Sequence, residues 1–233
     1  MPSSNYIQIN IIERNNMDNG NDAYWEKCWN EEDITELFGY LKAYENLKSE
    51  EIEIFKQHKL KKICDAACGF GAYSLAFSSK GFETYGFDIS AKAVKIARKG
   101  LEPYGVDPAN YKVASIVDTG YEDEAFDGVV ANSVIDHMTS ELAEKAVNEL
   151  LRITAKGGLV LLSFDTAEQE DYEANHILLE DGSMRYTDGH RKGMIFRPYD
   201  WEMIDKLLGN HRVVSKRINQ KNEQMVVIQK TSE

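Results

Sequence analysis

Residues 63–71 read ICDAACGFG, which places an acid and two glycines directly before a predicted helix of small residues. Glycine permits tight turns and a close approach of the backbone to a ligand. The helix that follows presents free N–H groups and the positive end of its dipole. Asp88 ends the next apolar strand, where a carboxylate can accept both hydroxyls of a ribose. These residues predict a site for a nucleoside-containing cofactor.

Two other ligand patterns are not matched by these residues. The dinucleotide fingerprint Gly-x-Gly-x-x-Gly/Ala fails at its third position, which falls on Ser74. Cys64 and Cys68 stand four residues apart, but no matching Cys or His pair follows them, so no zinc site or other metal site is predicted. Both thiols are expected to be packed as small buried residues.

The elements that position these residues alternate between strand and helix. Strands are predicted at 62–66, 84–88, 111–117, 126–133 and 159–164, and helices at 72–79, 90–100 and 141–154. This alternation predicts an α/β fold with a mostly parallel sheet built from right-handed crossovers. Ser90 is the predicted N-cap of the second helix, and residues 156–158 are predicted to stop the third.

The flanking segments predict a single domain with additions. Residues 1–58 are interpreted as an N-terminal cap, with a frayed end up to about 22 and then one or two helices. Residues 59–165 form the cofactor-binding core. Two Asp-Gly pairs in 166–200 predict a two- or three-stranded insert on the substrate side. Residues 201–233 are expected to add a helix and a closing antiparallel pair of strands.

Five ordered motifs resemble those of the class I S-adenosylmethionine-dependent methyltransferases, of the type that acts on small molecules. The resemblance covers about residues 60–165 and implies a Rossmann-like, seven-stranded sheet with helices on both faces. It also implies S-adenosylmethionine as the cofactor. The motifs are residues 65–71, 86–90, 121–127, 132–138 and 150–158.

The resemblance assigns cofactor contacts to particular residues. Asp65 orients the loop, or the ammonium group of the cofactor through water, and Asp88 binds the ribose. Ala67 replaces the first motif glycine, and Ser115 stands where the family usually has an acid. The remaining implied contacts are Ala67, Gly69 and Gly71 for the methionine part, Ile89, Ser115 and Ile116 for adenine, the Asn132 carbonyl for the ammonium, and Tyr24, Trp25 and Trp29 as an aromatic cover. For the N-terminal aromatics, packing of the cap is the alternative role.

Two further groups are candidates for chemistry and acceptor recognition. His137 follows the fourth strand and is either a general base or a structural histidine with a backbone partner. Arg191 and Arg197 belong to a basic cluster in the insert and are candidates for binding an acceptor's carboxylate or phosphate. The alternative for this cluster is an ordinary charged hairpin surface.

Charge and composition narrow the partners. The 233 residues carry a net charge of −12, which disfavours DNA and anionic membranes as partners. No apolar run is long enough to span a membrane, and three cysteines favour a cytoplasmic location. A small-molecule acceptor is therefore expected. The alternatives are a tRNA or protein methyltransferase, or a fold relative that binds the cofactor without transferring methyl. The sequence gives no indication of the oligomeric state.

Overall fold

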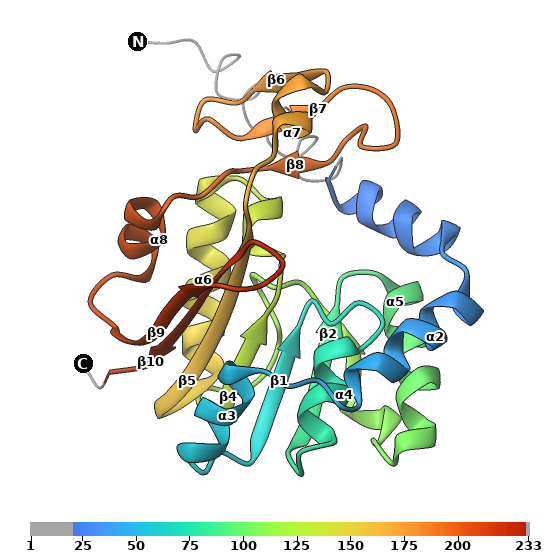
Figure 1. The fold of residues 1–233 in the computed structure, drawn as a ribbon, viewed down its shortest axis with the longest axis vertical. Helices are drawn as coiled ribbons and strands as arrows, with labels where there is room; N and C mark the ends of the chain where they lie inside the picture. The colour runs from blue at the N-terminus through green and yellow to red at the C-terminus, as the bar shows by residue number, and fades with distance from the viewer. Residues whose placement is uncertain (1–20, 232–233) are drawn as a thin grey trace.

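Short apolar segments between helices form the centre of a seven-stranded sheet in the computed structural model, which describes residues 21–231 (Figure 1). The strand order is β3–β2–β1–β4–β5–β10–β9. The first five strands are parallel, and β10 and β9 add an antiparallel edge. The predicted α/β fold with a mostly parallel seven-stranded sheet is confirmed. The strands are β1 Lys62–Ala66, β2 Glu83–Asp88, β3 Tyr111–Val113, β4 Phe126–Ala131, β5 Thr154–Asp165, β9 Arg212–Ile218 and β10 Glu223–Gln229.

Helices cover both faces of this sheet, and most of them begin at a polar capping residue. Asp33, Ser49, Ser90 and Asp200 each accept a backbone N–H of the first helical turn with their side chains. The predicted cap at Ser90 is confirmed. The helices are α2 Ile34–Tyr44, α3 Glu50–Gln57, α4 Ala72–Ser78, α5 Ala91–Leu101, α6 Ser140–Ile153, α7 Gln169–Glu173 and α8 Trp201–Leu208, with short 3₁₀ turns η1 Glu102–Tyr104, η2 Pro108–Asn110 and η3 Ile135–His137.

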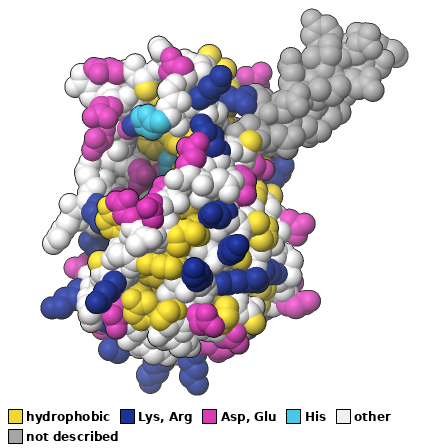
Figure 2. Space-filling model, turned by 90° about the vertical axis from the view of Figure 1, so that its right-hand side faces the viewer, with side chains coloured by type: hydrophobic (Ala, Val, Ile, Leu, Met, Phe, Trp, Pro, Cys, Tyr) yellow, Lys and Arg dark blue, Asp and Glu magenta, His cyan; other side chains and the backbone are white. Residues whose placement is uncertain are grey.

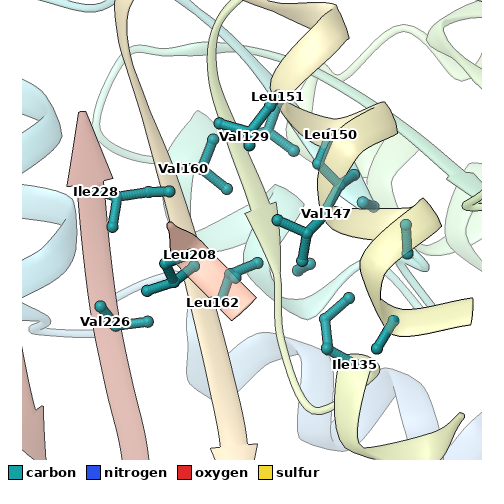
Figure 3. Packing of buried hydrophobic residues seen from close by; sticks show 14 of the residues in the cluster. Val129, Ile135, Val147, Leu150, Leu151, Val160, Leu162, Leu208, Val226 and Ile228 are labelled. Carbon is teal, nitrogen blue, oxygen red and sulfur yellow. The ribbon is translucent and has the colours of Figure 1, made fainter. Parts of the chain in front are cut away.

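The core follows the two-residue alternation of the central strands. Val160 and Leu162 of β5 pack with α6 and α8, whereas Leu159 and Leu161 pack on the opposite face with α3 and α4. Figure 3 shows the first of these clusters, in which Val226 and Ile228 of β10 point toward Val160 and Leu162 of β5 and Leu208 of α8. Both faces are therefore closed by apolar side chains, and the polar groups that a ligand needs are confined to strand ends and loops.

Two predicted boundaries differ from the structure by four residues or more. β3 ends at Val113 instead of 117, because the chain turns away at Ser115, which forms an isolated bridge with Asp118. β5 begins directly after α6 at Thr154, so the predicted break at 156–158 is wrong. Gly157 has φ +74° and the register between β4 and β5 shifts here, so the glycines form an irregularity within the strand.

An insert follows β5 and lies above the carboxyl edge of the sheet in Figure 1. Its strands β6 His176–Leu178, β7 Met184–Tyr186 and β8 Ile195–Phe196 form a separate antiparallel sheet, which confirms the predicted excursion. Residues 21–31 are helical and pack beside it through Tyr24 and Trp25. With α2 and α3, the described part of the N-terminal region holds three helices instead of one or two.

The predicted frayed end lies almost wholly outside the described residues, and the boundaries at 58, 165 and 200 stay predictions. The antiparallel pair β9–β10 and the helix α8 are confirmed. Within residues 21–231, no helix combines the length and apolar character that crossing a membrane requires.

Candidate active site

A cavity of about 440 Å³ opens at the carboxyl edge of the sheet, beneath the helix of residues 21–31. Its walls come from the loops that follow β1, β2, β3 and β4, so segments distant in sequence converge on one space. The predicted site residues that line it are Asp65, Ala67, Gly69, Asp88, Ile89, Ser115, Ile116, Asn132, Trp29 and His137. Gly71, Tyr24, Arg191 and Arg197 lie elsewhere among the described residues.

The loop after β1 turns sharply because three of its residues have positive φ angles. Ala67, Gly69 and Gly71 have φ of +53°, +52° and +88°. A left-handed alanine costs about 1–2 kcal/mol, and strain of this kind concentrates at functional sites. A Cβ on Gly69 would lie 2.8 Å from the Trp29 ring. A Cβ on Gly71 would lie 2.8 Å from a methyl of Leu101. Gly69 therefore lets the backbone approach the cavity under Trp29, while Gly71 starts α4.

Asp65 connects the end of β1 to the first turn of α4. Its Oδ2 accepts the backbone N–H of Ser74 at 2.9 Å and the Ser74 hydroxyl at 2.7 Å. Burial raises the pKa of Asp65 to about 7, although the two bonds from Ser74 oppose that rise. Asp65 thus fixes the loop geometry through one carboxylate oxygen.

Asp88 occupies the end of β2 and is held from both sides. Oδ2 accepts the N–H of Gly69 and Oδ1 accepts the N–H of Ser90, each at 2.9 Å. Burial raises the pKa of Asp88, opposed by these backbone bonds. Because each carboxylate oxygen has a second lone pair, two hydroxyl groups of a ligand can still be accepted. This donor–acceptor arrangement fits a ribose.

The opposite wall is formed by residues after β3 and β4. Ser115 and Ile116 lie in the turn that leaves β3, and Ile89 lies next to Asp88 on the cavity surface. Asn132 follows β4, and its side-chain oxygen accepts the hydroxyl of Ser163 at 2.9 Å. A side chain fixed in this way leaves the neighbouring backbone in a defined position. Ile89 and Ile116 give this wall an apolar surface with few polar groups, which suits a nucleobase.

Aromatic side chains close the cavity on the side of the helix of residues 21–31. Trp25 and Trp29, two of the three aromatics expected there, line it together with Tyr44, Phe70 and Tyr73, which were not predicted. Tyr24 instead packs against the insert and forms an edge contact with Trp25, with ring centroids 5.1 Å apart. Trp25 and Trp29 therefore border the cavity and Tyr24 does not, and their role as a cover for a cofactor stays a prediction.

His137 lies between this cavity and a second one of about 280 Å³. Its Nδ1 is 3.3 Å from the carbonyl oxygen of Ile195, and its Nε2 is 3.7 Å from Oδ2 of Asp165. Burial lowers the pKa of His137, but the carboxylates of Asp136 and Asp165 outweigh it and raise the pKa overall. Both ring nitrogens thus face protein groups, an arrangement typical of a positioned histidine.

The same residue links three parts of the molecule. The amide nitrogen of Asn21 donates to the carbonyl of His137 at 2.8 Å, and the Asn21 oxygen accepts the N–H of Ile195 at 3.1 Å. Asn21 is buried. The helix of residues 21–31, the loop after β4 and strand β8 are therefore joined at one point above the cavity. Nothing in the sequence around Asn21 indicated this role, because its partners lie more than 100 residues away.

The two arginines of the predicted basic cluster already have acidic partners. Arg191 forms an ion pair with Asp171 at 2.7 Å and lines the second cavity. Arg197 lies 3.5 Å from the carboxylate of Asp181 and also donates to the Asp181 carbonyl. Arg197 lines neither cavity among the described residues, and it holds the loop between β6 and β7. The structure thus separates two residues that the sequence grouped together.

Comparisons with known proteins agree with this architecture. Residues 64–162 match the model of a family described as a methyltransferase domain. The chain is 37% identical over 111 residues to a tRNA (carboxymethyluridine(34)-5-O)-methyltransferase of Arabidopsis thaliana, covering 47% of this chain and 25% of that protein. It is 29% identical over 108 residues to ajmaline N-methyltransferase of Rauvolfia serpentina, covering 46% of this chain and 36% of that protein.

A solved structure shares the fold over a longer region. A SAM-dependent methyltransferase from Methanosarcina mazei superposes with a TM-score of 0.66 at 19% identity, covering 80% of this chain and 99% of that one. The matched region spans 25% to 42% of the length of the first curated relatives. Residues 64–162 thus match the methyltransferase-domain family, and the described fold is the one seen in a solved SAM-dependent methyltransferase.

Proposed function

We propose that this protein transfers a methyl group from S-adenosylmethionine to a small-molecule acceptor. The observation that carries the proposal is the cavity in which Asp88, the left-handed loop after β1 and Trp29 meet. When bound, S-adenosylmethionine supplies a methyl group on a positively charged sulfur. The fit rests on this chain's own groups, since Asp88 has lone pairs for two hydroxyls and Gly69 leaves space that a Cβ would fill.

Each wall of the cavity has a distinct task in this proposal. Asp88 binds the ribose, and Ile89, Ser115 and Ile116 contact the adenine. Asp65 and the backbone of the loop that follows hold the methionine part, together with the Asn132 carbonyl. All these groups are fixed by hydrogen bonds or packing before the ligand arrives, so little ordering accompanies binding.

The chain's main contribution to the reaction is positioning. The acceptor's lone pair forms a bond to the methyl carbon while the carbon–sulfur bond breaks and its electron pair goes to sulfur. An acceptor that is already nucleophilic needs its approach aligned and water excluded. The aromatic wall of Trp25, Trp29 and Tyr44 excludes water and aligns the acceptor. This proposal does not need a general base, and both ring nitrogens of His137 face protein groups.

Enclosure and charge support a small acceptor over a tRNA. The insert and the helix of residues 21–31 lie over the carboxyl edge of the sheet, which limits the size of what reaches the cavity (Figure 1). In Figure 2, acidic side chains are spread over the displayed face together with Lys and Arg, and no face-wide basic surface appears there. The net charge of −12 also opposes a polyanion. The tRNA-modifying relative keeps tRNA as the second candidate.

A screen with radiolabelled S-adenosylmethionine tests this function. The protein is incubated with small amines, phenols, thiols and carboxylic acids, and separately with unmodified tRNA. Label is expected in at least one small-molecule class and not in tRNA. Transfer to tRNA alone would select the second candidate. Tight cofactor binding without transfer to any acceptor would favour a non-catalytic member of the family.

The three free thiols support a reducing, cytoplasmic setting for the reaction.

Arg191 is the residue of the basic cluster from which we expect an effect on the acceptor. Arg191→Ala should lower kcat/KM for an anionic acceptor by about 10- to 100-fold, as expected for a charged hydrogen bond. Cofactor affinity should not change, because Arg191 does not line the cofactor cavity. Arg197→Ala is the matched control, which should lower the melting temperature and leave kcat/KM close to the wild-type value. Equal kcat/KM for Arg191→Ala and wild type would return this residue to a purely structural ion pair.

Cofactor affinity is expected to rise as the pH increases from 5.5 to 7.5. Asp65 has a pKa raised to about 7 by burial, and its ionised form attracts the cofactor's ammonium. Below that pKa the protein must release a proton when the cofactor binds, so affinity should fall by up to about 10-fold per pH unit. Calorimetry in two buffers of different ionisation enthalpy measures the proton release. Asp65→Asn should bind more weakly and without this pH dependence, whereas an unchanged profile in this variant would assign the titration to another group.

A further inference from the structure

Three side chains of metal-ligating type meet where β4 and β5 end. Asp136 and His137 belong to η3, and Asp165 is the last residue of β5. One ligand atom from each residue lies within 4.8 Å of the other two. His137 and Asp165 line the second cavity, and His137 also lines the cofactor cavity. The cluster therefore sits between the two cavities, with space for solvent or a ligand beside it.

Each of the three side chains has one polar atom held by an orienting contact. Nδ1 of His137 lies 3.3 Å from the Ile195 carbonyl, to which it can donate. Oδ1 of Asp165 accepts the hydroxyl of Ser133 at 2.9 Å. Oδ2 of Asp136 accepts the N–H of Asp165 at 2.8 Å. Metal-binding histidines and carboxylates are typically oriented by outer contacts of this kind.

The remaining ligand atoms of the cluster form a set that suits a cation. Nε2 of His137 and Oδ2 of Asp165 face each other at 3.7 Å. With Nδ1 donating to a carbonyl, a neutral imidazole presents a lone pair at Nε2, so that two acceptors would stand opposite one another with room for a shared cation. Oδ1 of Asp136 is buried and has no hydrogen-bond partner in the described part of the chain, and the whole residue is 0% exposed. An unsatisfied buried carboxylate oxygen is costly and calls for an explanation.

We propose that Asp136, His137 and Asp165 bind one divalent metal ion. A set of one imidazole nitrogen and two carboxylates suits Mn²⁺ or Zn²⁺. This proposal departs from the sequence-based expectation that the chain has no metal site, because that expectation considered only cysteine spacing. The ligands come from η3 and from the end of β5, which tertiary structure brings together although 27 residues separate His137 from Asp165.

A metal here would also change the field in the second cavity. That cavity is lined by five carboxylates, and its two cationic side chains are Arg191, paired with Asp171, and Lys221. A divalent ion is the largest local charge in such a site and would make the recess attractive to anionic or oxygen-bearing groups. The five carboxylates are those of Asp165, Glu168, Glu170, Asp171 and Glu223.

Titration of the chelator-treated full chain with Mn²⁺ alone tests the proposal, without cofactor or acceptor. Electron paramagnetic resonance measures free Mn²⁺, and calorimetry gives the stoichiometry. One equivalent is expected to bind, and the melting temperature should rise as Mn²⁺ is added. His137→Ala and Asp165→Asn should each weaken binding by about 10-fold or more, since loss of an outer-shell contact alone costs about 10- to 100-fold. Zn²⁺ should displace the bound Mn²⁺.

Glu170→Gln is the matched control, because it removes a carboxylate of the same cavity that lies outside the cluster. It should bind Mn²⁺ as wild type does. The proposal is overturned if wild type binds no stoichiometric Mn²⁺, which would leave His137 as an imidazolium paired with Asp165. It is equally overturned if Glu170→Gln loses as much affinity as Asp165→Asn. Since methyl transfer is not the readout, these outcomes are independent of the proposed function.

Discussion

Replacing Asp88 with alanine is expected to weaken S-adenosylmethionine binding by about 10²- to 10⁴-fold. The estimate takes two charge-assisted hydrogen bonds to the ribose at about 1.5–3 kcal/mol each. Asp88 is 5% exposed and lies at the cavity surface, so water does not readily replace the lost carboxylate. Isothermal calorimetry with the cofactor and with its demethylated product measures the change. The cofactor-induced rise in melting temperature should disappear in parallel.

The design must separate ribose binding from the support that Asp88 gives to the loop after β1. Asp88 accepts the N–H groups of Gly69 and Ser90, so the alanine variant leaves both without their partner. The melting temperature of the ligand-free variant measures that structural part. Ser115→Ala serves as the matched control in the same cavity, with an expected loss of about 10-fold or less for a neutral hydrogen bond. Wild-type affinity in folded Asp88→Ala would show that the ribose binds elsewhere.

The parallel core could be predicted because its signals are local. The glycines after β1, the acid that ends β2 and the apolar run of β5 each lie within a few residues of the feature they determine. The glycines at 157 and 158 misled the prediction because glycine both ends helices and accommodates irregular strands. Only the pairing of β4 with β5 decides between the two, and that pairing is not local.

The cavity walls depend on contacts that no local pattern contains. Trp25 faces the cavity and Tyr24 faces the insert because the helix of residues 21–31 is anchored by Asn21 to His137 and Ile195. Without that anchor, the two neighbouring aromatics are equivalent in the sequence. Arg191 likewise appeared to be a free cation, since its partner Asp171 lies 20 residues away in α7. Charge pairing of this kind follows from the fold and not from composition.

The second large expected effect is on the stability of the protein, at the sheet edge formed by β9. Arg217→Met is expected to lower the free energy of unfolding by about 3–5 kcal/mol, because it leaves a buried carboxylate without its cation. The carboxylate is that of Glu51 in α3, whose side chain is 2% exposed. Its Oε1 lies 2.8 Å from Nε and 2.6 Å from Nη2 of Arg217 in β9. Urea unfolding followed by circular dichroism gives the free energy and the m-value.

Two comparisons identify the buried charge as the cause of that loss. Lys216 is the neighbour of Arg217 on β9 and pairs with Asp205, which is 54% exposed. Lys216→Met should therefore cost about 1 kcal/mol or less. Adding Glu51→Gln to Arg217→Met should recover much of the stability, since an amide is less costly to bury than an unpaired carboxylate. A loss in Arg217→Met no larger than that in Lys216→Met would mean that water or Ser49, whose hydroxyl donates to Glu51, already compensates the charge. The folded fraction of each variant should still bind the cofactor with wild-type affinity, because none of these residues lines the cavity.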